Sequence, residues 1–130
     1  MNGIRKLTVV VPTEEYDGLE DVVSEVFSKA KTFTIADVEE NNVKNVMVFE
    51  NPASSYKHGS GPIVANKLAE LKVNLVLTAK LGLEVSELLK QHNIKTISVR
   101  PGTRVLDSIK EAMFKSETKG IGKARRKSNN

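Results

Sequence analysis

The sequence contains no cysteine in its 130 residues. This absence excludes a disulfide scaffold, zinc sites built on thiolates and iron–sulfur clusters ligated by cysteine. Long apolar runs are also missing, and none approaches the roughly 20 residues that a membrane-spanning helix requires. The apolar run after Arg5 and Lys6 covers only residues 7–11 and is too short for the apolar core of a secretory signal, so the start of the chain does not look like one. We therefore expect a cytoplasmic protein without membrane association.

Basic charge is concentrated at the C-terminal end of the chain. The net charge is +4, but residues 115–130 hold six basic side chains and one acidic one, and the other residues hold 14 basic and 15 acidic side chains. Residues 115–130 also contain almost nothing apolar, which is typical of a solvated, disordered segment. The length fits one domain. We predict one domain over residues 1–114 and a basic tail over residues 115–130.

The apolar pattern predicts an α/β fold. Three strands come first, and strands and helices then alternate, which indicates a five-stranded mixed β-sheet (β-β-β-α-β-α-β-α) with helices on its faces. The continuous run at residues 7–11 predicts a buried central strand, and right-handed crossovers place the last two strands parallel to it. The predicted strands are 7–11, 32–38, 43–50, 75–78 and 96–99, and the predicted helices are 62–71, 83–92 and 105–114.

Three details of this pattern are specific enough to test. Residues 39–42 predict a hairpin turn in which the Asn41-Asn42 pair takes the left-handed conformation. In the last helix, we expect Leu106, Ile109 and Met113 to face the core. His92 falls on the apolar face of its helix in the last turn, where it would complement the helix C-terminus rather than act as a ligand.

The loop before the second half of the chain is the first candidate site. Gly59 and Gly61 would let a ligand approach the backbone, and Pro62 fits the first turn of a helix. The free N–H groups of that helix start favour an anion, and His58 beside them could bind a metal. The alternative is an ordinary turn before a helix, with His58 merely exposed.

The connection at residues 78–82 is the second candidate site. Ligands of open α/β sheets collect at the carboxyl ends of strands where the strand order reverses, here between Thr13 and Thr78. Lys80 would offer a cation there, although a solvated lysine in a plain connection is equally compatible with the sequence. The predicted ligand-binding residues are Thr13, His58, Gly59, Ser60, Gly61, Lys80 and Gly82, with His58 as the metal ligand.

No catalytic set can be assembled from the sequence. There is no cysteine nucleophile and no Gly-x-Ser-x-Gly motif, and Gly59-Ser60-Gly61 lacks the third glycine of a dinucleotide-binding motif. An RNase-H-like nuclease would need carboxylates on the central strand, and residues 7–11 have none. The acidic residues could hold a hard cation or form a solvated loop; they are Glu14, Glu15, Asp17, Glu20 and Asp21. We expect no enzyme.

A set of ordered motifs between residues 7 and 99 resembles the dinitrogenase iron–molybdenum cofactor biosynthesis family, which includes NifX-like proteins and the C-terminal domain of NifB-type proteins. The resemblance implies an RNase-H-like α/β fold and binding of an iron–molybdenum cofactor or its iron–sulfur precursor. The motifs are Val11-Pro12-Thr13, Val23-Ser24-Glu25, Phe33-Thr34-Ile35-Ala36-Asp37-Val38, Glu50-Asn51-Pro52-Ala53, His58-Gly59-Ser60-Gly61 and Leu68-Ala69-Glu70-Leu71.

Two positions depart from the family pattern. Where the family commonly has His-Phe-Gly-Arg, this chain has Val26-Phe27-Ser28-Lys29, and the family's glycine-rich turn is Ala79-Lys80-Leu81-Gly82. The resemblance thus implies a small non-enzymatic carrier of an iron–sulfur or molybdenum cluster or a related anion, with cluster-assembly or iron–sulfur proteins as partners. The alternative is a nucleic-acid-associated protein acting through basic residues 119–127, although few aromatic residues and no reading motif accompany them.

The predicted boundary at residue 114 can be tested by limited proteolysis. Protease should cut near Lys115–Lys123 and leave a resistant core, because the tail has no apolar face with which to dock. Mass spectrometry of the digest identifies the core. Loss of the core together with the tail would place the boundary elsewhere.

Overall fold

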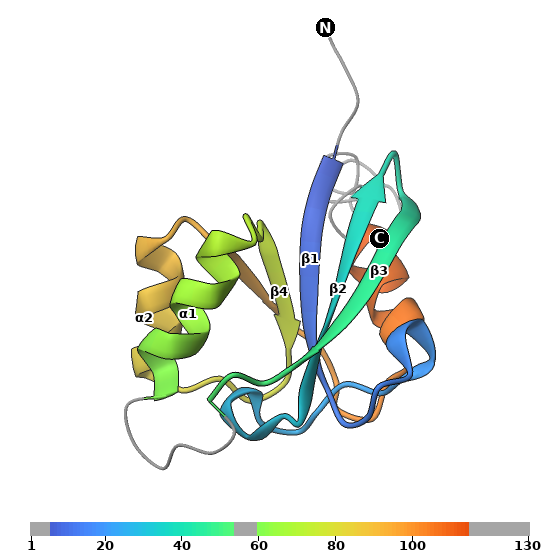
Figure 1. Cartoon of the computed structure of the whole chain (residues 1–130). Helices are drawn as coiled ribbons and strands as arrows, with labels where there is room; N and C mark the ends of the chain where they lie inside the picture. The colour runs from blue at the N-terminus through green and yellow to red at the C-terminus, as the bar shows by residue number, and fades with distance from the viewer. Residues whose placement is uncertain (1–5, 54–59, 115–130) are drawn as a thin grey trace, which may run out of the picture.

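A five-stranded mixed sheet forms the centre of the computed structural model, which describes residues 6–53 and 60–114 (Figure 1). Outside the described residues lie His58, Gly59 and the predicted basic tail. The nucleic-acid alternative rests on that tail. The strands are β1 (Lys6–Thr13), β2 (Thr32–Glu39), β3 (Asn42–Glu50), β4 (Leu75–Thr78) and β5 (Lys95–Ser98). The helices are α1 (Ser60–Glu70), α2 (Leu83–Gln91) and a C-terminal helix over residues 105–114, and two short 3₁₀ turns are η1 (Gly18–Glu20) and η2 (Phe27–Lys29).

The sheet has the strand order β3-β2-β1-β4-β5. β2 is antiparallel to both β1 and β3, whereas β4 is parallel to both β1 and β5. The α/β class, the mixed sheet and the central position of the first strand are therefore confirmed. Val9, Val10 and Val11 are fully buried because both faces of β1 are covered, and this explains the uninterrupted apolar run.

The β2–β3 hairpin turns one residue earlier than the Asn41-Asn42 pair predicts. Glu40 and Asn41 have φ values of 52° and 69°, the left-handed pair that a two-residue hairpin turn requires. The β2–β3 register shifts between Asp37 and Val38, which marks a β-bulge near the turn. Beyond the bulge the pairing is regular to the ends of both strands.

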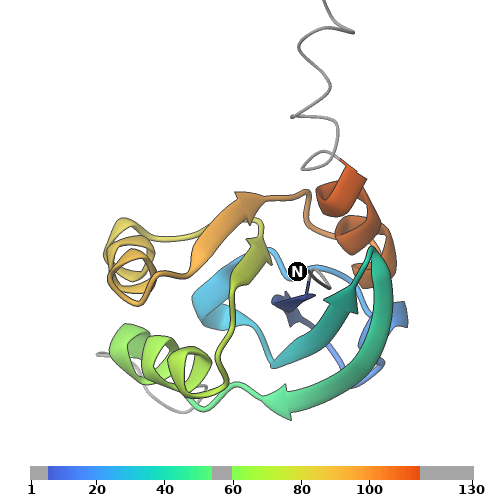
Figure 2. The ribbon, with the colours of Figure 1, turned by 90° about the horizontal axis from the view of Figure 1, so that it is seen from above.

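Helices cover both faces of the sheet (Figure 2). α1 and α2 pack on one face, where Leu68 and Leu89 meet Val10, Val76 and Phe33. The C-terminal helix covers the other face with apolar residues on one side of its surface. That second core contains Val9, Val11, Ala36, Val38, Leu75, Leu77, Val105, Ile109, Ala112 and Met113. None of the helices in the described residues is long and apolar enough to cross a membrane.

Two predicted side-chain positions differ from the structure in part. Leu106 is only half-buried, because the C-terminal helix turns Val105 and Ala112 inward together with Ile109. His92 is the C-cap of α2, which agrees with its predicted place at the helix C-terminus, but its side chain is exposed rather than on the apolar face. Its backbone N–H still ends the helix by donating to the carbonyls of Leu88 (3.3 Å) and Leu89 (3.0 Å).

Two leucines of α2 provide a matched test of the first core. Leu89 is 0% exposed and Leu83 is 78% exposed. Leu89→Ala should lower the free energy of unfolding by about 2–5 kcal/mol, because it removes buried methyl groups and leaves a cavity. Leu83→Ala should change it by less than about 0.5 kcal/mol. Urea unfolding measures both, and similar losses would show that α2 packs through a different face.

Candidate functional site

α1 and α2 begin side by side at the end of the molecule where β1 and β4 end, the lower end in Figure 1. Gly61 in the first turn of α1 has its Cβ position 3.1 Å from Cγ2 of Val85 in the first turn of α2. The positive dipole ends of both helices therefore converge. Gly82 precedes α2 without a side-chain cap, and Lys80 is exposed next to it.

Residues 22–27, here called the bridging segment, fill the crevice predicted between the ends of β1 and β4. The Ser24 N–H donates to the Pro12 carbonyl at the end of β1 (2.8 Å). The Phe27 N–H donates to the Lys80 carbonyl (2.9 Å), and the Lys80 N–H donates to the Glu25 carbonyl (3.1 Å). The backbone at Lys80 is thus held by this segment, while its side chain remains exposed.

Thr13 lies behind the bridging segment rather than on an open crevice. It is fully buried, and its Oγ1 lies 2.6 Å from Oγ1 of Thr32 and 3.1 Å from Oγ1 of Thr34 on β2. These hydroxyls satisfy one another across two strands. The structure therefore does not bring Thr13 together with Lys80, and its role as a ligand-binding residue stays a prediction.

The glycines at this end differ in their surroundings. Gly61 is buried, and a side chain there would press on Val85 and Leu88, so this glycine lets α1 approach α2 closely. Gly82 is exposed with nothing within 4 Å of its Cβ position, which leaves room for a ligand. Val26, where the family pattern has histidine, forms a parallel bridge with Lys80 and thus lies at this same end. Ser60 is the first residue of α1.

Thr78 has the one buried side-chain polar atom without a hydrogen-bond partner in the described residues. Side chains alternate along β4, and Val76 faces the α1–α2 core whereas Leu75 and Leu77 face the other. The side chain of Thr78 therefore faces the α1–α2 side at the end of β4. A buried hydroxyl without a partner is costly, so a native one calls for an explanation.

The acidic residues after β1 do not act as one group. Asp21 is 3% exposed and the other four are exposed, which separates their roles. Its carboxylate accepts hydrogen bonds from the backbone N–H groups of Glu14 (3.3 Å), Glu15 (2.9 Å), Asp17 (3.3 Å) and Val22 (2.8 Å). Within residues 6–53 and 60–114, no three His, Cys, Asp or Glu side chains gather as metal ligands. This buried role could have been recognised from the sequence, because Asp21 directly precedes Val22-Val23 in a segment too apolar for a solvated loop.

Arg104 ties the acidic loop to the C-terminal helix. Hydrogen bonds to Asp107 and Glu20 raise the pKa of its guanidinium group above the usual value. Thr103, next to Arg104 in the chain, also contacts the bridging segment. Its carbonyl accepts a hydrogen bond from the Val23 N–H (2.9 Å). The bridging segment is thus fixed between the strand ends and the residues that lead into the C-terminal helix.

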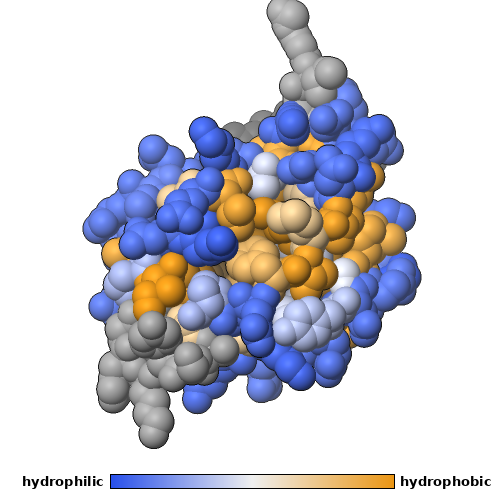
Figure 3. Space-filling model, viewed as in Figure 1, coloured by the Kyte–Doolittle hydropathy of each residue, from blue (hydrophilic) through white to orange (hydrophobic). Residues whose placement is uncertain are grey.

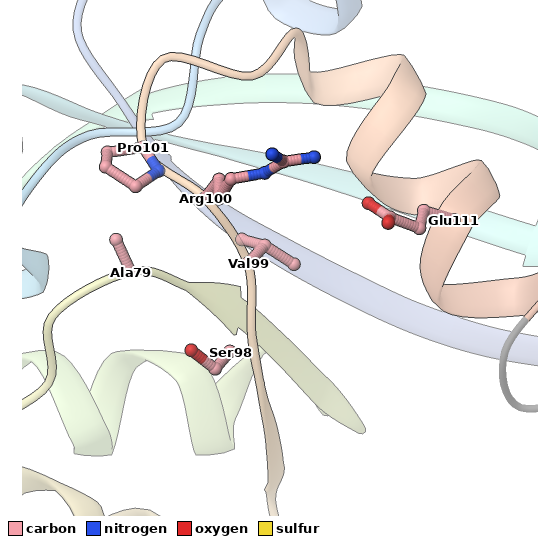
Figure 4. Close-up of a pocket in the computed structure, with 6 residues that line it drawn as sticks. All are labelled: Ala79, Ser98, Val99, Arg100, Pro101 and Glu111. Carbon is pink, nitrogen blue, oxygen red and sulfur yellow. The ribbon is translucent and has the colours of Figure 1, made fainter.

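A hollow of about 380 Å³ lies beyond the ends of β4 and β5 and contains none of the predicted site residues (Figure 4). The side chains of Arg100 and Glu111 point toward one another across it. Sequence reasoning did not single out either residue, because they come from separate elements. The hollow is lined by Ala79, Ser98, Val99, Arg100, Pro101 and Glu111.

Replacing Asp21 tests whether its carboxylate organises this end of the molecule. Asp21→Asn should lower the free energy of unfolding by about 1–3 kcal/mol, because an amide NH₂ group would face N–H donors that then lose their acceptor. The exposed neighbour Asp17 is the control, and Asp17→Asn should cost less than about 0.5 kcal/mol. Thermal unfolding of both variants measures the difference, and equal effects would contradict the structural role of Asp21.

Comparison with known proteins agrees with this architecture. The protein TM1290 from Thermotoga, a candidate NifB protein, is 32% identical, with a TM-score of 0.65 over 79% of this chain and 84% of that chain. The apo form of the orange protein from Desulfovibrio gigas is 22% identical, with a TM-score of 0.73 over 82% of this chain and 87% of that chain, a likeness of fold.

A shorter match is to the uncharacterized protein MJ0580 of Methanocaldococcus jannaschii, 29% identical over 68 residues. It covers 52% of this chain and 58% of the relative, so the chain matches little more than half the length of that protein. Residues 6–114 match the family model described as dinitrogenase iron-molybdenum cofactor. With this match over nearly all of the described fold, the chain belongs to the dinitrogenase iron–molybdenum cofactor family, among NifX-like and NifB-like proteins.

Proposed function

We propose that this chain is a non-enzymatic cytoplasmic carrier. Its cargo would be a preassembled iron–sulfur or iron–molybdenum cluster, or a related anion, bound where α1 and α2 begin. The convergence of the two helix starts, with Gly61 against Val85, is the observation that supports this most directly. Family membership supplies the class of cargo. The domain would comprise residues 1–114, with the basic tail as a separate segment.

The electrostatics of this end favour a negatively charged cargo. Helix starts offer unpaired N–H groups and a positive dipole end, which stabilise anions. The start of α2 has no side-chain cap in competition for its N–H groups, and Lys80 adds a positive charge. Glu84 in the first turn of α2 and Glu25 in the bridging segment act against the anion and limit its affinity.

Direct ligands to a cluster would be few. The chain has no thiolate to offer, and Val26 stands where the family pattern has histidine. The cluster would therefore arrive assembled and bind through His58, backbone N–H groups and Lys80. Such a small donor set holds a cargo weakly, which suits transfer between a cluster-assembly protein and an iron–sulfur acceptor.

Thr78 would complete the site as a buried hydrogen-bond donor. Thr78 is 2% exposed with its side chain on the α1–α2 side, and its hydroxyl has no hydrogen-bond partner in the described residues. A cargo atom that accepts this hydrogen bond would remove the cost of leaving the hydroxyl unpaired. A role in binding and a role in folding are distinguishable, because Thr78→Val removes the hydroxyl and keeps the branched shape.

Anaerobic titration with an iron–sulfur precursor cluster, followed by absorbance, tests the proposal. His58→Ala should abolish most binding, and Lys80→Ala should weaken it about 2–5-fold, the scale of one charge near a helix end. Thr78→Val should weaken binding without loss of thermal stability. Lys90→Ala removes the same charge at the far end of α2 and should bind like wild type.

Three outcomes distinguish failure of the carrier function as a whole from failure of the role assigned to one residue. A folded wild type that binds no cluster would refute the carrier function. Equal binding by wild type and His58→Ala would remove His58 from the site and leave the helix starts as the binding element. Equal losses in Lys80→Ala and Lys90→Ala would indicate attraction by overall charge rather than a site.

A further inference from the structure

β5 forms a free edge of the sheet. It is the outermost strand on the side opposite β3 and pairs only with β4, and Figure 2 shows it between α2 and the C-terminal helix. The Lys95 N–H donates to the Asn74 carbonyl (3.0 Å), so it points toward the side of β4. Because backbone N–H and C=O groups alternate in direction along a strand, those of Thr96 and Ser98 point away from β4. No hydrogen bond within the described residues occupies these outward groups, so another strand can pair with them.

Two hollows border this edge, one on each face of the sheet. The hollow of about 380 Å³ in Figure 4 reaches the edge at Ser98, on the side where Glu111 of the C-terminal helix lines it. A second hollow, of about 460 Å³, reaches the edge at Thr96, on the side of α2. Side chains of an added strand alternate between the two faces, so successive ones turn toward different hollows. The second hollow is lined by Ser86, Lys90, Asn93, Ile94, Lys95 and Thr96.

The hollow beside α2 is positively charged. Lys90 and Lys95 line it, and none of the described residues that line it is acidic. Glu87 lies near Lys90, with 3.8 Å between its carboxylate and the ammonium group, but both side chains are more than half exposed. Such an exposed pair contributes little, so Lys90 can also attract the carboxylate of a ligand. The other hollow carries one charge of each sign, Arg100 and Glu111, and therefore selects less by charge.

We propose that the β5 edge binds an extended, acidic segment of a partner protein as an additional strand. The backbone of the segment pairs with the outward N–H and C=O groups of Thr96 and Ser98. Thr96 lies opposite Val76, whose side chain enters the α1–α2 core, so a residue of the added strand opposite Thr96 also faces α2. An Asp or Glu at that position enters the hollow lined by Lys90 and Lys95. This surface lies toward the end of α2, whereas the cargo site proposed above lies at its start.

This chain's own segments are poor occupants because they are basic. β5 of a second copy would bring another Lys95 to the same edge, and like charges on paired strands repel. Residues 115–130 hold six basic side chains and one acidic one, so the tail is repelled from the hollow as well. The charge of the hollow therefore favours an acidic segment from a different protein.

β3 is the alternative place for an added strand, because it is the other outermost strand of the sheet. Its surroundings are apolar, since Met47 is 56% exposed and Figure 3 shows apolar surface gathered in the middle of the face that carries the sheet. The charges on β3 balance, with one lysine, Lys44, and one glutamate, Glu50. An acidic segment therefore gains nothing from β3 by charge, and the place where it binds distinguishes the two edges.

Peptide selection tests the proposal. Short random peptides displayed on phage and selected on the full chain should be enriched in acidic and β-branched residues. In NMR hydrogen exchange, the selected peptide should slow exchange of the Thr96 and Ser98 amides about tenfold or more, because they become hydrogen-bonded. The proposal is overturned if no acidic peptide is enriched, or if the protected amides lie on β3.

Two pairs of matched variants test the backbone pairing and the charge. Thr96→Pro should stay folded, because its N–H points away from β4 and edge strands tolerate proline, but should weaken peptide binding about tenfold or more. Thr96→Val keeps the N–H and should bind like wild type. Lys90→Ala should weaken binding about 2–5-fold, the scale of an exposed ion pair, whereas Lys110→Ala, an exposed lysine of the C-terminal helix, should not. Equal binding by the two Thr96 variants, or equal losses in the two lysine variants, would contradict the proposal.

N-methylated peptides test strand addition without any change to the protein. Methyl groups on every second backbone nitrogen of the selected peptide give two versions of it. Only alternate N–H groups of an added strand face β5, so one version should lose binding and the other should keep it. Equal effects of the two versions would show that the peptide does not bind as a strand.

Discussion

β1 is bonded on both edges and covered on both faces, and this burial constrains the rest of the fold. Its N–H and C=O groups pair with β2 on one side and β4 on the other, and its valines enter both cores. A strand enclosed in this way must end in structure that satisfies its last polar groups, because water has little access to them. The bridging segment does this where the Ser24 N–H meets the Pro12 carbonyl.

The same segment decides what remains open at this end of the molecule. It occupies the space between β1 and β4, where open α/β sheets commonly bind ligands. The exposed charged side chains left there, within the described residues, include Glu25, Lys80 and Glu84 beside the start of α2. The proposed ligand site would therefore be displaced from the strand ends toward the helices. That displacement accounts for the difference between Thr13, which is buried among threonines, and Lys80.

Most of the fold could be predicted from the sequence, because each strand or helix has a characteristic local spacing of apolar residues. The limits of β4 and of the C-terminal helix agree with the predicted ones, since both are apolar patterns with clear ends. The bridging segment could not be predicted. Its bonds join residues that are far apart in the chain, such as Phe27 with Lys80 and Val23 with Thr103, and no local pattern encodes them.

The site was predicted by residue type, and residue type is ambiguous. Glycine before a helix suggested close approach of a ligand, yet Gly61 makes room for α2. Asn51, part of a family motif, is a structural residue, because its side chain donates to the Ala30 carbonyl (2.9 Å) and accepts from the Ala53 N–H (2.9 Å). Thr78 was noted only as the end of a strand, and its unpaired hydroxyl becomes visible once neighbours are known.

A carrier must release what it binds, and this requirement gives the sparse donor set a physical meaning. Thiolate ligands would hold a cluster tightly, and their exchange would depend on the incoming ligands of the acceptor. A single imidazole would replace several thiolates here, and helix dipoles and a lysine add only small energies that fall with solvent exposure and salt, so a cargo held by these few groups would exchange readily. In the proposed site, the buried Thr78 hydroxyl would orient the cargo, since it can donate only one hydrogen bond. The proposed site thus combines low affinity with a defined orientation, which is what transfer to a specific acceptor requires.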